Sequence, residues 1–418
     1  MHDVDRSGRG VNIPVLAGAG FVVASLVTYW FWWADNPDGL VAVYVVVCVL
    51  ALLVGSYIGN TLSLRPSVPA KIGLHWLWIA CLALIFTATV NISGYYQSFG
   101  EIAQFVLEPG DAYERVKFLN RNDLVTPTGI SETLGPVASV LAFTKYVVFG
   151  WSVLFWSVMP RSLKVTSLVS MFFYAIQAVL IGAMVNVGTV LLSTMVVLIV
   201  KERRRIKVTN VRFLFRAAVL ASFGLAVLSY FLGSRGAAGA GIVSRIVAGA
   251  DGLLFYIAHG FTGLGYALRL PFEWTGGQTI FYGFSRLFIG GVPPDSYLAR
   301  AEDASAWSST QLWSTAIPWL ASDITFVGVP FLLVAVGFWS GRLWIESCAT
   351  LDPFAVLLLG QLTIAIFFFP ANNHLLQTFP NAIGFLLIFL AYLLSRQRSR
   401  AGVTDYRRRA VGSVTEAD

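Results

Sequence analysis

A lysine near the middle of a long apolar stretch is the most unusual charged residue of this sequence. Lys145 lies in LAFTKYVVFG. A cation at the centre of a lipid bilayer costs roughly 2.5–3.5 kcal/mol on insertion scales, so it needs a partner or a water-filled cavity. The position therefore predicts an anion-binding group. The alternative is that Lys145 pairs with Asp323 or extends its ammonium group toward the membrane surface.

Two further residues could transfer a proton. Asp323, in WLASDITFVGVPF, could act as a base, orient an arginine or cap a helix. His374, in FPANNHLLQTFP, has an ordinary pKa of about 6.5, which suits proton transfer, and Pro370 and Pro380 would restrict its loop. The alternative for His374 is a solvated loop histidine. His259 is more simply explained as the polar side of an amphipathic helix.

Arginines form the third group of candidates. A guanidinium matches two phosphate oxygens at once and keeps its charge, so a set of arginines suits a diphosphate at a membrane surface. For each arginine alone, the alternative is a solvated side chain. The histidines and cysteines show no metal-ligand spacing, so we expect neither a metal nor another cofactor. The arginines in the two longest polar segments are Arg115, Arg121, Arg235, Arg245, Arg269, Arg286 and Arg300.

Long apolar segments must position these residues. An apolar fraction of 56% with only 12% charged residues lies outside the range of soluble proteins. A helix needs about 20 apolar residues to cross a bilayer. The sequence predicts an all-α polytopic membrane helix bundle, a single integral membrane domain over residues 1–418, with about ten transmembrane helices. The predicted spans are Val11–Trp33, Gly39–Asn60, Ile72–Ile92, Gly135–Pro160, Val165–Ala183, Val187–Val200, Phe213–Leu232, Ala316–Trp344, Pro353–Phe369 and Pro380–Leu394.

Charge in the breaks between spans predicts the orientation. Every second break, starting at the N-terminus, is rich in Lys and Arg, and such breaks are cytoplasmic by the positive-inside rule. Both termini are then cytoplasmic, in a bacterial inner membrane. Residues 93–134 and 233–315 become outer segments, and residues 395–418 become a cytoplasmic basic tail.

Two parts of this topology have alternatives. The second outer segment begins with apolar residues on one helical face, including Ile242, Ile246 and Phe261, which predicts amphipathic helices in the outer interface. The alternative is one further span over residues 252–268, which would move the C-terminal arginines outside. The fifth and sixth spans are short and share one apolar block, so they are two tilted spans or a re-entrant hairpin.

The layout resembles Wzy-type polymerases of lipid-linked oligosaccharide repeat units, which are related in architecture to O-antigen ligases. The shared features are many spans, an outer Tyr-x-Arg at Tyr113 and Arg115, and a large outer segment late in the chain. The stretch SDITFVGVPFLLVAVGFWSG resembles the Asp-x-Gly span of that family, and GLGYALRLPFEWTGGQTIFYGFSRL resembles its loop text. In contrast to related ligases, the turn NVGT between the paired middle spans carries no arginine.

The resemblance implies glycosyl transfer on the outer leaflet, from one polyprenyl-diphosphate-linked glycan to another. His374 or Asp323 would be the base, and Arg245 and Arg269 would act on the departing diphosphate. The residues expected to bind the substrate are Lys145, Tyr113, Arg115, Arg235, Arg286 and Arg300. Expected partners are the lipid-linked oligosaccharide, membrane lipids, a chain-length regulator and a flippase, with no nucleic acid. The alternatives are a ligase-like glycan transferase and a lipid-linked oligosaccharide flippase or transporter.

Overall fold

The fold was analysed in a computed structural model of the chain. Every regular element in the described part of the chain is a helix. The model describes residues 11–33, 37–62, 69–70, 72–96, 98–121, 130–182, 184–203, 224, 226, 229–234, 241–305, 307 and 314–415. Eight helices in these ranges are long and apolar enough to cross a membrane. The prediction of a polytopic helical bundle is therefore confirmed at the level of fold class.

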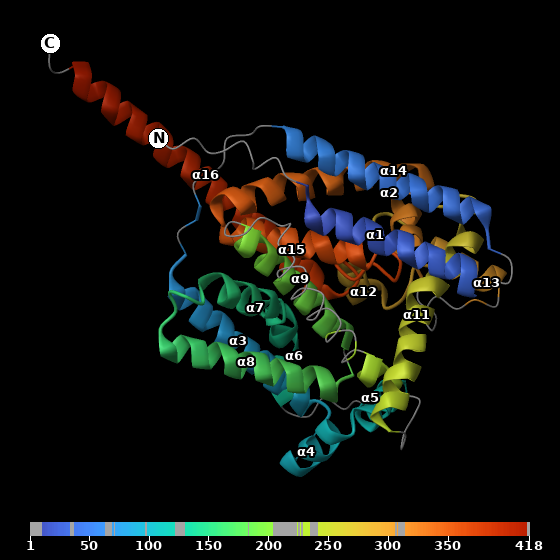
Figure 1. Ribbon diagram of the computed structural model, residues 1–418. Coiled ribbons are helices and arrows are strands. Elements are labelled where there is room, and N and C mark those ends of the chain that lie inside the picture. The colour runs from blue at the N-terminus through green and yellow to red at the C-terminus, as the bar shows by residue number, and fades with distance from the viewer. Residues whose placement is uncertain are drawn as a thin grey trace.

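Sixteen helical segments make up the described chain (Figure 1). They are α1 (Ile13–Thr28), the π-helix η2 (Tyr29–Trp33), α2 (Gly39–Thr61), α3 (Leu74–Ser93), α4 (Phe99–Leu107), α5 (Pro109–Arg121), α6 (Ile130–Leu141), α7 (Thr144–Phe155), α8 (Arg161–Leu180), α9 (Met184–Arg203), α11 (Ile242–Ala267), α12 (Tyr282–Ile289), α13 (Tyr297–Ala304), α14 (Ala316–Thr350), α15 (Pro353–Phe367) and α16 (Phe379–Thr415).

Most predicted spans correspond to one helix each. The first three spans are α1 with η2, α2 and α3; the fifth and sixth are α8 and α9; the eighth is α14, and the tenth is the first part of α16. The ninth, α15, is apolar but only 15 residues long. The seventh predicted span, 213–232, lies mostly outside the described residues. The alternative of a re-entrant hairpin is not supported, because α8 and α9 have 20 residues each.

The fourth predicted span is broken rather than continuous. Helices α6 and α7 meet at an angle of 46°. The hydroxyl of Thr144 donates to the carbonyl of Leu141 at 2.8 Å, which gives that carbonyl a partner outside the regular helical ladder. The break places Thr144 and Lys145 in the first turn of α7. Lys145 therefore lies at the start of a helix, not in the middle of a straight span.

The bundle has two chemically different ends. At one end, which we call the basic end, Arg203 donates to the carbonyl of Val11 at 2.9 Å and Arg342 to the carbonyl of Leu62 at 3.1 Å. Both contacts join the ends of spans that are distant in sequence. The predicted topology places the same ends together on the cytoplasmic side.

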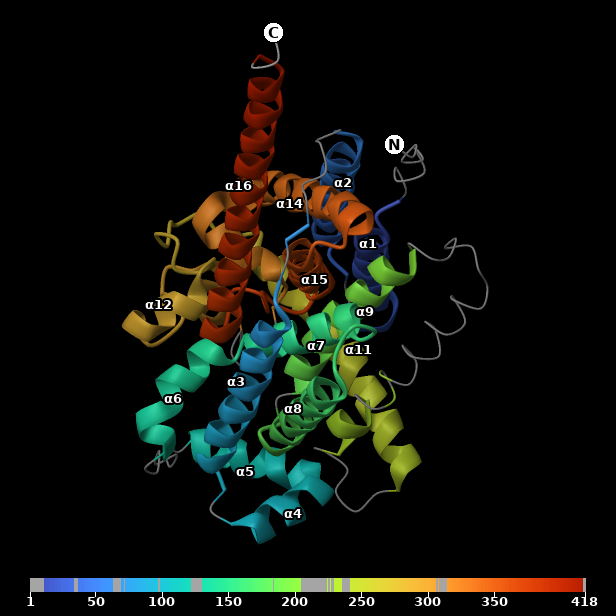
Figure 2. The same cartoon turned by 90° about the vertical axis from the view of Figure 1, so that its left-hand side faces the viewer.

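The opposite end, which we call the loop end, carries α4, α5, α11, α12 and α13 (Figures 1 and 2). Hydrogen bonds there join other span ends, such as the hydroxyl of Tyr96 to the carbonyl of Leu180 at 2.8 Å. The amide of Ala316 at the start of α14 donates to the carbonyl of Phe369 after α15 at 2.9 Å.

Helix α11, in the segment predicted to form amphipathic helices, is one continuous helix of 26 residues. Figure 1 shows it running across the direction of α1 and α2 at the loop end. Its second half packs into the bundle through Phe261 and Leu264, which are fully buried. Its first half exposes Val243 and Val247. By length and composition alone it could also cross a membrane.

Helices α2 and α14 pack at backbone contact. A Cβ atom at Gly55 or Gly59 would overlap the carbonyl oxygen of Val334 or Phe338 on α14. A Cβ atom at Gly337 on α14 would in turn overlap a carbonyl oxygen of α2. Small residues spaced four apart allow membrane helices to approach this closely.

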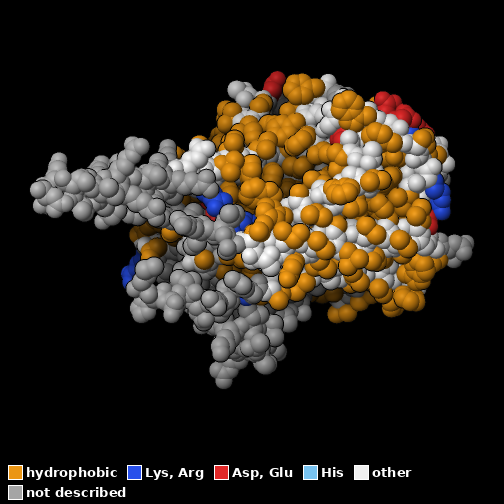
Figure 3. Space-filling model, turned by 90° about the horizontal axis from the view of Figure 1, so that it is seen from above, with side chains coloured by type: hydrophobic (Ala, Val, Ile, Leu, Met, Phe, Trp, Pro, Cys, Tyr) orange, Lys and Arg blue, Asp and Glu red, His pale blue; other side chains and the backbone are white. Residues whose placement is uncertain are grey.

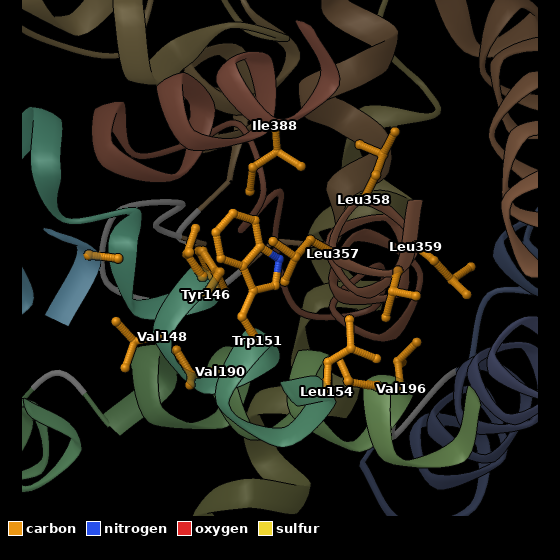
Figure 4. Packing of buried hydrophobic residues seen from close by; sticks show 14 of the residues in the cluster. Tyr146, Val148, Trp151, Leu154, Val190, Val196, Leu357, Leu358, Leu359 and Ile388 are labelled. Carbon is orange, nitrogen blue, oxygen red and sulfur yellow. The ribbon is translucent and has the colours of Figure 1, made fainter. Parts of the chain in front are cut away.

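A large apolar core joins α3, α7, α8, α9, α15 and α16 (Figure 4). Trp151 lies at its centre, and its indole Nε1 donates to the carbonyl of Pro353 at 3.4 Å. Tyr146 and Leu357 pack beside it and are also buried. This core fixes the positions of α7 and α15, which carry or flank Lys145 and His374.

The outer surface of the bundle is apolar. Figure 3 shows a face covered largely by hydrophobic side chains, with charged side chains mostly near its margins. On α2, a largely apolar helix, Val43 is 64% exposed and Tyr57 is 70% exposed. Exposed apolar patches of this extent mark contact with lipid or protein. The bundle therefore has the surface of an integral membrane protein.

Candidate functional site

The first candidate residue, Lys145, is buried at the loop end of α7. Its side chain is 4% exposed. Its ammonium lies 5.1 Å from the centre of the Tyr146 ring. No carboxylate in the described ranges comes within ion-pair distance of it. The alternative of a pair with Asp323 is therefore wrong in this structure, and Lys145 is a buried cation without a described counter-ion.

A chain of polar contacts leads from this region to His374. The Tyr146 hydroxyl lies 3.2 Å from Thr189 Oγ1 on α9 and 3.1 Å from Asn381 Oδ1 on α16. The Asn381 amide then donates to the carbonyl of His374 at 2.9 Å. Lys145, the residue before Tyr146, adjoins one end of this chain of contacts, and the backbone carbonyl of His374 forms the other end. We call this the Lys145–His374 cluster: Lys145, Tyr146, Thr189, His374 and Asn381.

His374 is not a solvated loop histidine. Its ring packs edge-on against Phe368, with ring centres 4.6 Å apart. Burial lowers the pKa of His374 from 6.5 to about 3, because an imidazolium would lose its hydration there. The imidazole is therefore neutral near pH 7. A resting pKa this low makes His374 a weak base until an anion binds nearby and favours its charged form.

Asp323 is held by hydrogen bonds on both carboxylate oxygens, which is typical of a structural residue and not of a free base. Its carboxylate accepts five hydrogen bonds from one loop, residues 275–280. Oδ1 accepts from the Thr275 hydroxyl and from the amide of Gly277 at 2.8 Å. Oδ2 accepts from both the amide and the hydroxyl of Thr279 and from the amide of Ile280. Among the three predicted roles, orienting neighbouring groups fits best, although the oriented group is a loop rather than an arginine.

Three of the candidate arginines have carboxylate partners. Their charges are compensated by these partners, which reduces their capacity to bind a diphosphate. Arg300 also donates to the carbonyl of Pro271 and lies over the Tyr297 ring. The pairs are Arg115 with Glu101 at 3.0 Å, Arg269 with Asp38 at 2.7 Å and Arg300 with Glu273 at 2.5 Å.

The remaining arginines differ in their surroundings. Arg245 on α11 donates to the hydroxyl of Tyr230 at 3.3 Å, and no ion pair with a described carboxylate occurs. Arg286 is exposed on α12. Arg235 and the side chain of Arg121 lie outside the described residues. Arg245 is thus the half-buried candidate arginine whose charge stays available for an anion.

The predicted Tyr-x-Arg pair holds helices together. The Tyr113 ring packs against Gly182, whose φ of +68° makes the turn between α8 and α9. Arg115 lies over the rings of Tyr96 and Phe105, at 5.3 and 5.1 Å from their centres. Tyr113 and Arg115 therefore face different partners, and neither belongs to the Lys145–His374 cluster.

Several polar residues of the cluster were not singled out from the sequence. Thr189 and Asn381 connect it, and their only sequence signal is a polar residue at the end of an apolar segment. Outside the cluster, Gln361 on α15 is a further polar residue that was not singled out: it is fully buried, and neither amide atom has a hydrogen-bond partner within the described part of the chain. No set of three or more His, Cys, Asp or Glu in the described residues could hold a metal ion.

The fold and the buried cluster define a polytopic helical membrane protein with a polar site inside one end. Comparisons with known proteins add no family to this description. No protein-family model matches the chain, and neither a curated protein nor a solved structure matches it. The function must therefore be argued from the site.

Proposed function

We propose that this protein polymerises polyprenyl-diphosphate-linked oligosaccharide units on the outer leaflet of the bacterial inner membrane. The main support is Lys145, a buried cation that has no carboxylate partner in the described ranges and lies inside the end that carries the loop helices. A buried charge of this kind is too costly to keep for packing alone. A diphosphate would supply the missing counter-charge.

The reaction would break the bond between the sugar carbon and the diphosphate of one lipid-linked glycan. A hydroxyl of the second glycan would form the new bond to that carbon and release its proton. Lys145 would stabilise the charge that develops on the departing diphosphate. The same charge would raise the pKa of nearby His374, so that its imidazole accepts the proton as the bond breaks.

The membrane orientation of the proposal comes from charge. Arg203, Arg342 and Arg396 lie at the basic end, and the positive-inside rule makes that end cytoplasmic. The Lys145–His374 cluster then lies on the side of the outer leaflet. Partners of this function are the lipid-linked oligosaccharide, surrounding lipids, a chain-length regulator and a flippase that supplies substrate.

The glycan profile of a deletion strain tests this function against its alternatives. Loss of a polymerase leaves single repeat units on the lipid anchor at the outer side. Loss of a ligase leaves finished polymer on the lipid carrier, and loss of a flippase leaves single units inside. Polymer of normal length in the deletion strain, with transfer to its final acceptor intact, rules out the polymerase.

A further inference from the structure

The loop that Asp323 holds also contacts the segment that carries His374. The loop comprises residues 275–283, which follow α11 along the chain and end in the first turn of α12. At its first part, Thr275 and Thr279 are buried against α14. At its second part, the loop reaches the turn between α15 and α16, residues 368–378.

Two hydrogen bonds and one close approach form the second contact. The amide of Gly283 donates to the carbonyl of Leu376 at 2.9 Å. The side-chain amide of Asn373, the residue before His374, donates to the carbonyl of Ile280 at 3.3 Å. A Cβ atom at Gly283 would lie 2.5 Å from the Thr378 carbonyl carbon, so only glycine permits this approach.

A continuous path therefore runs from Asp323 through the loop to the Asn373 side chain before His374 and to the Leu376 carbonyl after it. The carboxylate fixes the amides of Gly277, Thr279 and Ile280. The carbonyl of Ile280 then fixes Asn373. Ile280 takes part in both contacts, since its amide donates to Asp323 and its carbonyl accepts from Asn373. Movement at the Asp323 end of the loop should therefore displace the His374 turn.

We propose that Asp323 is a positioning residue: it clamps loop 275–283 and thereby holds the His374 turn in the Lys145–His374 cluster. This inference rests on the proposed function for its effect on activity, but the clamp itself is a property of the fold. Both carboxylate oxygens of Asp323 accept hydrogen bonds from the loop. These contacts leave no lone pair of Asp323 to accept a proton from a substrate.

The charge and shape of Asp323 are both required for the clamp. Asparagine keeps the size but replaces one acceptor oxygen by an NH₂ group that would face the loop donors. At least one backbone amide of the loop then loses its acceptor, whichever way the side-chain amide is turned, because the threonine hydroxyls can turn to accept but a backbone N–H cannot. Buried donors without an acceptor are costly, so the loop should open more often.

A buried cysteine in the His374 turn can report this opening. Leu375 is 5% exposed and directly follows His374. In a full-length chain whose Cys48, Cys81 and Cys348 are replaced by alanine, Leu375→Cys should react slowly with a membrane-impermeant maleimide. Adding Asp323→Asn should accelerate this labelling at least about tenfold, because the turn loses its clamp.

The matched control is Asp295→Asn, the same chemical change at an exposed carboxylate of the same loop end. It should leave the labelling of Leu375→Cys unchanged. Equal labelling rates with Asp323 and with Asp323→Asn overturn the clamp. If the Asp323→Asn protein does not reach the membrane, Thr279→Val removes one donor and keeps the carboxylate; it should give a smaller acceleration, and no acceleration overturns the proposal.

The pH dependence of glycan polymerisation separates positioning from proton transfer. With Asp323→Asn, a positioning role predicts a lower rate and an unchanged shape of the pH profile. Loss of the acidic limb of the profile would make Asp323 the base and overturn the proposal. Absence of polymerisation in the parent protein would refute the proposed function alone, since the labelling experiment tests the clamp without any substrate.

Discussion

At the scale of single residues, burial and partners separate the candidate charges. The sequence identified Arg115, Arg269 and Arg300 as cations but could not find their partners. Arg269 pairs with Asp38, which lies 231 positions earlier in the chain. Such a pair depends on tertiary packing, so no local pattern predicts it. Lys145 was the stronger prediction, because the cost of burying its charge can be argued from the apolar segment alone.

Replacing Lys145 by methionine should leave the protein folded and abolish its activity. Methionine keeps the length of the side chain and removes the cost of the buried charge, so thermal stability in detergent should be equal or higher. Polymerisation should fall by about 10²–10³ if the ammonium stabilises the departing diphosphate. The measurement is the amount of unpolymerised lipid-linked units in a complemented deletion strain.

Lys164→Met is the matched control, since Lys164 lies at the basic end near Trp156. That variant should retain polymerisation. A stable, fully active Lys145→Met protein would remove the anion-binding role. Because Asp323 is bonded to loop 275–280, a second change of Asp323→Asn should not compensate for the loss of Lys145.

His374 should make the protein sensitive to mild acid. Its folded pKa of about 3 lies below its ordinary value of 6.5, so the unfolded chain binds the proton more readily between these values. The stability from neutral His374 is complete above about pH 6.5 and is lost as the pH falls toward 3. At pH 5 the loss should be about 2 kcal/mol.

Thermal unfolding in detergent at pH 7 and pH 5 measures this effect. The drop in melting temperature between the two pH values should shrink in His374→Gln. His75→Gln, at an exposed position of α3, should show the same drop as the unchanged protein. An equal drop in all three proteins would show that protonation of His374 does not limit stability.

At the scale of elements, the sequence predicted the spans better than their bends. Hydropathy located most long helices because it sums over about 20 residues. The bend between α6 and α7 depends on one hydrogen bond of Thr144, which a sum over many residues does not register. The clamp of Asp323 was missed for a similar reason: Thr275, Gly277 and Thr279 approach it only in the folded chain.

The contact between α2 and α14 should be the most sensitive helix pair to added volume. Gly337→Leu places a side chain where the carbonyl of Leu52 lies, so the helices must separate. The folded state should lose about 1–3 kcal/mol or more, as overpacked cores do. Gly20→Leu on α1 is the control, since nothing lies within 4 Å of its Cβ position.

Thermal stability of both variants in detergent measures the difference. Gly337→Leu should unfold at a clearly lower temperature than the unchanged protein, and Gly20→Leu should not. Equal melting temperatures for the two variants would mean that α2 and α14 do not approach as closely as their backbones indicate.

At the scale of the whole molecule, the two ends of the bundle differ in charge and in the helices that they carry. The basic end carries arginines of α9, α14 and α16, and the loop end carries the short helices that lie outside the predicted spans. The charge alternation was readable from sequence because it is a local property of each break. The convergence of α7, α9, α16 and the His374 turn on one polar cluster was not, because it depends on how the helices pack.

Reporter fusions should therefore place the loop end outside and the basic end inside. Fusions after Gly110 on α5 and after Pro294 before α13 should report the outer side, and fusions after Arg203 and Arg396 should report the cytoplasm. The result also decides the role of α11: if it lay across the bilayer as a further span, Pro294 and Arg203 would report the same side. Cytoplasmic signals at both Gly110 and Pro294 would move the Lys145–His374 cluster to the inner leaflet. Polymerisation on the outer leaflet would then be excluded, whatever the activity of the Lys145 variants.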